Sequence, residues 1–197
     1  MAIAALIPAV LVGERQIAGR VRSATAGDAE KQSREAQLEF AGIPRTLLQY
    51  LDDHLPNFEL PKNEEADPTI LQGFTLRGSK QPSPFACSGD FNGDGLKDFA
   101  LLLRDKARET LELLAFHQTH GHTYTHFVLW KVEFSSIPDP VSLFYLECEK
   151  PGKKRDFHGA RAVDVKNDSI TVDSMEGAGE LFYFGHGRYT RILIGGH

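Results

Sequence analysis

Residues Thr110–Phe134 read TLELLAFHQTHGHTYTHFVLWKVEF, two runs of aliphatic, β-branched and aromatic residues on either side of a short polar segment. Such runs favour β-strands, and the Thr119–His122 segment (THGH) has the glycine expected of a hairpin turn. In a regular strand, every other residue from Tyr124 to Val132 would lie on one face. This stretch therefore predicts an antiparallel hairpin with a long second strand.

Similar runs continue along the chain on both sides of this hairpin. Turn-forming Gly, Pro, Asn and Asp residues separate them at intervals typical of an antiparallel meander. We therefore expect a mainly β (α+β) fold over residues 69–197, either one antiparallel meander sheet or a two-sheet β domain. The expected strands are Ile70–Arg77, Phe85–Phe91, Asp98–Arg104, Thr110–Gln118, Thr123–Phe134, Val141–Cys148, Arg161–Val165, Ser169–Asp173, Glu180–Phe184 and Arg188–Ile194.

The residues before this β domain have a different character. Ala2–Gly13 is apolar and Ala24–Ala26 resembles a cleavage site, so residues 1–26 could be a signal peptide. No basic residue precedes the apolar run, and a leader on a cytoplasmic protein is the alternative. Residues 27–68 are expected to form a polar spacer that contains one helix over residues 44–55, because the leucines there share one stripe.

The composition limits the classes of function. Apolar residues make up 41% of the chain and charged residues 25%, which is typical of a globular domain. The net charge of −5 argues against nucleic-acid binding through phosphate contacts. No apolar run is long enough for a transmembrane helix, so we expect no membrane span.

The Gly89–Phe99 segment (GDFNGDGLKDF) carries the strongest chemical signal. Calcium takes six to eight oxygen ligands, and oxygen donors recur here at alternate positions of a glycine-rich loop. The twelfth position is Leu101, where an EF-hand has a bidentate Glu, so an EF-hand is not expected. A plain acidic turn is the alternative, since Asn-Gly and Asp-Gly are common turn dipeptides. The predicted Ca²⁺ ligands are the side chains of Asp90, Asn92, Asp94 and Asp98 and the backbone carbonyl of Leu96.

Together with the apolar run that follows it, this loop (GDFNGDGLKDFALLL) resembles the calcium-binding loop of FG-GAP/VCBS-type repeats. Such repeats occur in integrin-like β-propellers and in many exported bacterial proteins. The resemblance implies a calcium-binding loop that joins two antiparallel strands. A propeller needs several such repeats, and the sequence has no second loop of this pattern, so we do not expect a closed propeller.

Four histidines, His117, His120, His122 and His126, lie around the predicted hairpin turn. An H-x-H pair with a third histidine nearby could ligate zinc. A metal-dependent hydrolase using the His117–His126 hairpin is therefore the alternative function. If no metal binds, His120 and His122 occupy the turn, and His117 and His126 could be cross-strand neighbours.

Cys87 and Cys148 lack the C-x-x-C spacing of zinc knuckles and thioredoxin-type sites. They could pair in an oxidising compartment or remain two buried thiols in a reducing one. The sequence alone leaves both states open.

The sequence contains no nucleophile elbow, P-loop or dinucleotide-binding motif. We therefore expect a non-catalytic, calcium-stabilised β module that binds a protein or envelope partner. The apolar N-terminal run favours an extracytoplasmic location, periplasmic or secreted, with a cytoplasmic location as the alternative. Neither the identity of the partner nor the oligomeric state can be inferred from the sequence.

Overall fold

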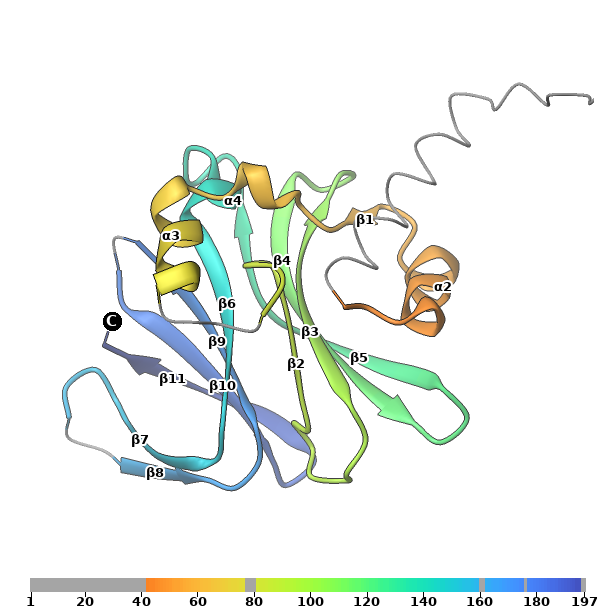
Figure 1. Cartoon of the computed structure of the whole chain (residues 1–197), viewed down its shortest axis with the longest axis vertical. Helices are drawn as coiled ribbons and strands as arrows, with labels where there is room; N and C mark the ends of the chain where they lie inside the picture. Colours follow the sequence, from red (N-terminus) through yellow and green to blue (C-terminus); the bar gives the residue numbers. More distant parts are fainter. Residues whose placement is uncertain (1–41, 77–80, 160–161, 176, 196–197) are drawn as a thin grey trace, which may run out of the picture.

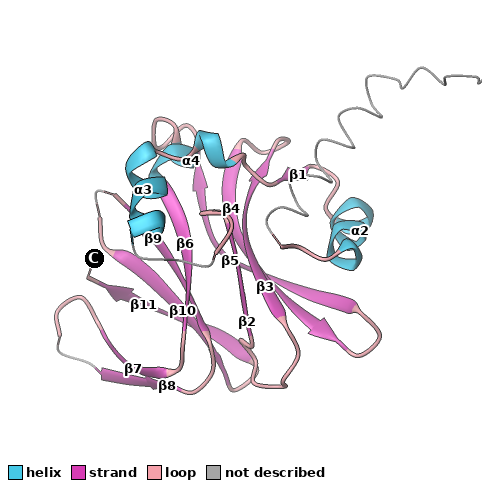
Figure 2. Ribbon diagram, in the orientation of Figure 1, coloured by secondary structure: helices cyan, strands magenta, loops and turns pink. Residues whose placement is uncertain are grey.

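The computed structural model of the chain describes residues 42–76, 81–159, 162–175 and 177–195. Within these residues the strands form two antiparallel sheets and one small two-stranded sheet, accompanied by a few short helices (Figures 1 and 2). The expected mainly β, two-sheet architecture is confirmed, and the described strands do not form a propeller. The predicted signal peptide over residues 1–26 lies outside the described residues.

The first sheet has the strand order β1-β3-β4-β5, and β2 also pairs with β3. Most residues of β3 and β4 are buried; the second sheet lies against one face of the first sheet, and helix α2 packs on the other face, chiefly against β5. Two-sided burial explains why these strands are nearly continuous hydrophobic runs. The strands are β1 (Phe58–Glu59), β2 (Ala86–Gly89), β3 (Asp98–Asp105), β4 (Thr110–Thr119) and β5 (Thr123–Glu133).

The second sheet has the order β11-β10-β9-β6, and the small sheet pairs β7 with β8. None of the described helices is long and apolar enough to cross a membrane. The strands are β6 (Phe144–Glu149), β7 (Gly152–Arg155), β8 (Ala162–Val165), β9 (Ser169–Ser174), β10 (Gly179–Gly185) and β11 (Arg188–Ile194). The helices are α2 (Arg45–His54), the 3-10 helix η1 (Asn63–Glu65), α3 (Pro68–Leu76) and α4 (Pro140–Leu143).

The two sheets meet where β2 runs beside β6 (Figure 1). Cys87 of β2 and Cys148 of β6 form a disulfide, with 5.7 Å between their Cα atoms. Close to it, the Leu146 amide donates a hydrogen bond to the Pro84 carbonyl at 2.7 Å. Of the two states that the sequence allowed for these cysteines, the structure has the paired one.

A β-bulge in the β4–β5 hairpin changes which residues of β5 face inward. Leu113 pairs with Trp130 and the next residue, Leu114, pairs with Val128, so β5 contains one extra residue. Trp130 consequently faces the second sheet, whereas Val128 is 55% exposed on the opposite face. The expectation that every other residue from Tyr124 to Val132 shares one face is wrong, because the bulge reverses the alternation.

Three segments differ from the predicted strands. The strand expected over Val141–Cys148 begins only at Phe144, because Pro140 starts the short helix α4 (Pro140–Leu143). Residues 70–77 were expected to form a strand, but Pro68–Leu76 forms helix α3. Pro68 suits the first helical turn, and Ile70 and Phe74, four residues apart, pack together against Tyr145. Conversely, the basic Gly152–Arg155 segment forms strand β7, because it pairs with β8.

Helix α2 lies where the leucine stripe predicted it, and Leu47, Leu48 and Leu51 are its buried residues. The helix packs on the first sheet through two polar contacts as well as apolar ones. The Tyr50 hydroxyl lies 2.9 Å from His126 Nδ1, and the Thr46 hydroxyl lies 3.1 Å from the Tyr124 hydroxyl.

Candidate metal centre

The predicted calcium loop connects β2 to β3, which are antiparallel neighbours. Gly93 and Gly95 adopt positive φ angles of 79° and 82°, a conformation that glycine reaches without steric cost. These two residues allow the chain to curl tightly between the strands. The loop is therefore formed locally by the residues that the sequence pattern singles out.

The Asp90 carboxylate organises the curled part of the loop. Its Oδ1 accepts hydrogen bonds from the backbone amides of Gly93 at 2.8 Å and Asp94 at 3.1 Å. Its Oδ2 accepts a bond from the Gly95 amide at 3.0 Å. Three backbone donors thus turn toward one carboxylate at the first position of the loop.

Asn92 and Asp94 contact each other on the exposed side of the loop. The Asn92 side-chain amide donates to Asp94 Oδ2 at 2.9 Å, and Asp94 Oδ1 accepts a bond from the Leu96 amide at 2.8 Å. The oxygen-bearing side chains at the third and fifth positions therefore lie together, close to solvent.

Asp98 differs from Asp90 and Asp94, the other acidic residues of the loop, because it is fully buried. Its carboxylate accepts hydrogen bonds from three backbone amides, those of Phe91 at 3.0 Å, Asn92 at 3.4 Å and Gln118 at 2.9 Å. Burial raises the pKa of Asp98 to about 6, and the negative charge of Asp94 adds to the rise, whereas the amide bonds oppose it. The loop thus contains one carboxylate whose charged form is disfavoured by its surroundings.

The loop also contacts the second sheet through the turn between β8 and β9. The Asp90 amide donates to Asp168 Oδ2, and the Asp168 amide donates to the Asp90 carbonyl, each at 3.1 Å. The Lys150 ammonium lies 2.9 Å from the same Asp168 oxygen. The Asn167 side-chain amide donates to the Phe91 carbonyl at 3.3 Å.

Sequence reasoning missed Asp168 and Asn167 as partners of the loop. Their segment, residues 164–168, is too sparse in oxygen donors to be a metal loop of its own. No local pattern predicts that a turn 78 residues away packs against Asp90. The contact depends on how the two sheets face each other.

The structure brings Asp90, Asn92, Asp94 and Asp98 into one loop, but backbone amides hold the carboxylates of Asp90 and Asp98. Among the described residues, no three His, Cys, Asp or Glu side chains are grouped as a metal site. The donor set itself consists of hard oxygen atoms, the ligand type that calcium prefers. The residues therefore fit calcium by their chemistry, and calcium binding stays a prediction.

The four histidines of the β4–β5 hairpin do not share one face. His117 Nε2 lies 2.7 Å from the Tyr189 hydroxyl of the second sheet, whereas His126 contacts Tyr50 of α2 on the opposite face. His126 pairs with Phe116 across the strands, so the idea that His117 and His126 are cross-strand neighbours is wrong. His120 and His122 lie at the exposed turn.

The environments of these histidines affect their protonation. Burial lowers the pKa of His117, and the charges of Asp94 and Asp90 partly oppose this effect. Burial also lowers the pKa of His126, and nearby His54 adds to the decrease. Burial raises the pKa of Tyr189, and the charge of Asp98 adds to the rise. The contact between His117 and Tyr189 is thus one between neutral groups at neutral pH.

The chain matches no known family model, characterised protein or solved structure. The resemblance to FG-GAP/VCBS-type repeats consequently remains a prediction that the loop residues alone support.

Proposed function

We propose that this protein is a non-catalytic, calcium-stabilised β module that binds a protein or envelope partner outside the cytoplasm. The observation that carries the proposal is the position of the loop, which combines hard oxygen donors with direct contacts to the second sheet. An ion held by Asp90, Asn92, Asp94, Asp98 and the Leu96 carbonyl would stabilise the contact between the sheets.

The charge of the loop supports calcium as the ion. Asp90 and Asp94 lie on the same loop as the buried Asp98, and the charge of Asp94 raises the pKa of Asp98 further. A divalent cation would supply the opposite charge and favour the ionised form of Asp98. Without a bidentate Glu, we expect a dissociation constant of about 10⁻⁴–10⁻³ M, the range of extracellular calcium modules.

The disulfide supports a location outside the cytoplasm. Disulfides persist in secreted and periplasmic proteins and are rare in the reducing cytoplasm. Cys87 and Cys148 are paired, which favours an oxidising compartment in which millimolar calcium could fill a weak site. Fractionation of the source cells followed by immunoblotting tests this part of the proposal, and recovery in the cytoplasmic fraction alone would contradict it.

The calcium site is tested by thermal unfolding of the full chain in EGTA and across a calcium titration. A ligand at a hundredfold excess over its dissociation constant adds about 2.7 kcal/mol of stability. We expect the parent protein to gain stability and Asp94→Ala to gain none. The matched control is Asp164→Ala, since Asp164 is an exposed aspartate outside the loop. A parent protein that does not respond to calcium would overturn the proposal.

Partner binding is tested by affinity capture from an envelope extract in calcium and in EGTA. The parent protein is the bait, with Asp94→Ala as the matched control. We expect captured proteins that depend on calcium and are lost with the variant. Capture that is identical with both baits and in both buffers would show that the loop has no part in binding.

A further inference from the structure

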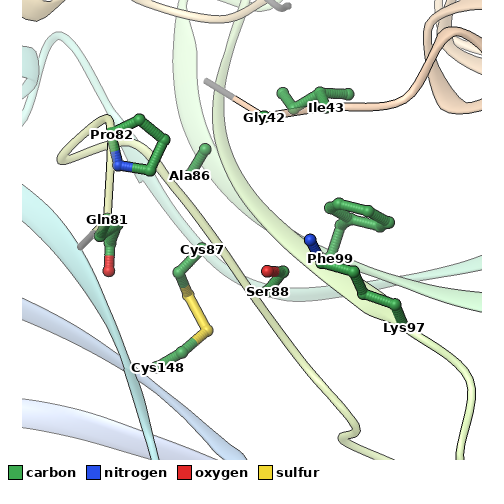
Figure 3. Close-up of a pocket in the computed structure, with 10 residues that line it drawn as sticks. All are labelled: Gly42, Ile43, Gln81, Pro82, Ala86, Cys87, Ser88, Lys97, Phe99 and Cys148. Carbon is green, nitrogen blue, oxygen red and sulfur yellow. A yellow bond between two sulfur atoms is a disulfide. The ribbon is translucent and has the colours of Figure 1, made fainter. Parts of the chain in front are cut away.

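A pocket of about 380 Å³ opens at β2, beside the disulfide (Figure 3). This volume falls within the range of pockets that hold small molecules. Its lining comes from the segment before α2, from β2 and residues 81–82 before it, from Lys97 of the loop and Phe99 of β3, and from Cys148 of β6. Strands held by the disulfide therefore form much of its wall.

The single charged residue among those that line the pocket is Lys97. Its ammonium lies 5.3 Å from the centroid of the Phe99 ring and points into the pocket (Figure 3). Among the described residues, no carboxylate lies within salt-bridge distance of this ammonium. The pocket thus presents a positive charge in a protein whose net charge is −5.

The remaining wall combines a few polar groups with apolar surface. Ser88 contributes a hydroxyl group beside Lys97, and Phe99, Ile43 and the disulfide contribute apolar surface. The Gln81 side-chain amide is held by the carbonyls of Ser83 and Leu146, at 2.8 Å each, so this part of the wall has a defined orientation. A few polar groups on an apolar wall are typical of a small-molecule site.

We propose that this pocket binds a small organic acid with a flat apolar body. The carboxylate would contact the Lys97 ammonium and the Ser88 hydroxyl, and the apolar body would pack on Phe99 and Ile43, which lie on the same side of β2 (Figure 3). Aromatic rings attract each other beyond the area that they bury, so the Phe99 ring favours an aromatic acid over an aliphatic one. No contact proposed for the acid involves a calcium ion, although Lys97 lies between the predicted calcium ligands Leu96 and Asp98.

The test uses the oxidised full chain in EGTA, with 3-phenylpropionate as the probe and its neutral amide as the comparison. Binding is followed by amide chemical shifts in a titration. We expect saturable shifts at Ser88 and Lys97, and binding of the neutral amide about fivefold weaker, since an exposed ion pair contributes up to about 1 kcal/mol.

Substitutions then test the role of the charge. Lys97→Gln should weaken binding of the acid about fivefold and leave binding of the amide unchanged. Lys97→Arg should retain most of the affinity for the acid. The matched control is Lys131→Gln, an exposed lysine of β5 that does not line the pocket. Shifts that do not saturate, or equal affinity for the acid and the amide, would overturn the proposal.

Discussion

Asp90 and Asp168 are joined by two hydrogen bonds that run in opposite directions. The Asp90 amide donates to the Asp168 carboxylate, and the Asp168 amide donates to the Asp90 carbonyl. Because Asp168 is 8% exposed, water cannot easily replace these bonds. The candidate metal loop is therefore part of the contact between the two sheets.

Removal of the Asp168 carboxylate should destabilise the protein. Asp168→Ala leaves the Asp90 amide without its acceptor and the Lys150 ammonium without its partner, so we expect a loss of about 1–3 kcal/mol in the free energy of unfolding. Urea denaturation measures the change. Asp164→Ala is the control, since Asp164 pairs with Lys166 at the surface and its loss should cost less than about 1 kcal/mol. Equal effects of the two substitutions would contradict the role assigned to Asp168.

The two glycines of the loop should respond differently to the same substitution. Both have a positive φ, so Gly93→Ala and Gly95→Ala each strain the backbone, at about 1 kcal/mol. A Cβ at Gly93 would also lie 2.7 Å from Asn167 Oδ1, whereas a Cβ at Gly95 would meet no atom within 4 Å. We expect Gly93→Ala to be the more destabilising in urea denaturation, and equal losses would show that Asn167 moves aside freely.

Loss of the disulfide should lower the free energy of unfolding more than any of the substitutions above. The bond closes a loop with a sequence separation of 61 residues. In the chain-entropy model, a loop of this size stabilises the folded state by about 4 kcal/mol. The double variant Cys87→Ala/Cys148→Ala, which leaves no free thiol, should show this loss in urea denaturation, and a loss below about 1 kcal/mol would contradict it.

The stability should fall as the pH decreases below about 6.5. Burial keeps the pKa of His117 below its usual value of 6.5, so in this range the unfolded chain binds a proton that the folded protein does not. His126 acts in the same direction. Asp98 acts in the opposite direction between 3.8 and about 6, because its pKa is raised in the folded state.

A substitution separates the contribution of His117 to the pH dependence of stability from those of His126 and Asp98. His117→Phe keeps an aromatic ring next to Phe127 and Phe184 but cannot titrate. The free energy of unfolding of this variant, measured in urea between pH 5 and 8, should depend less on pH than that of the parent protein. An unchanged dependence would show that His117 does not contribute.

Much of the fold could be predicted because its signals are local. The β4–β5 hairpin, the leucine stripe of α2 and the glycines of the loop each depend on neighbouring residues. The bulge in β5 could not be predicted, since it lies in the pairing of β5 with β4, which the residues of β5 alone do not specify. Helix α3 was missed because Pro68–Leu76 is apolar enough to suit a strand, and packing against Tyr145 selects the helix.

In the candidate site, too, the features set by neighbouring residues could be predicted and those set by tertiary packing could not. Local spacing identified Asp90, Asn92, Asp94 and Asp98, and these residues do form one loop. Contacts between the loop and Asp168 or Asn167 join segments far apart in the chain, which a single sequence does not reveal. The burial of Asp98, and with it the raised pKa, depends on tertiary packing beside Gln118.

The connections between the sheets also bear on how the protein folds. The Cys87–Cys148 bond spans 61 residues, the His117–Tyr189 contact spans 72 and the Asp90–Asp168 contact spans 78. None of them can form until distant parts of the chain have met, and proteins dominated by such contacts fold in milliseconds to seconds. The hairpins are therefore expected to assemble early, with the joining of the two sheets as the slow step.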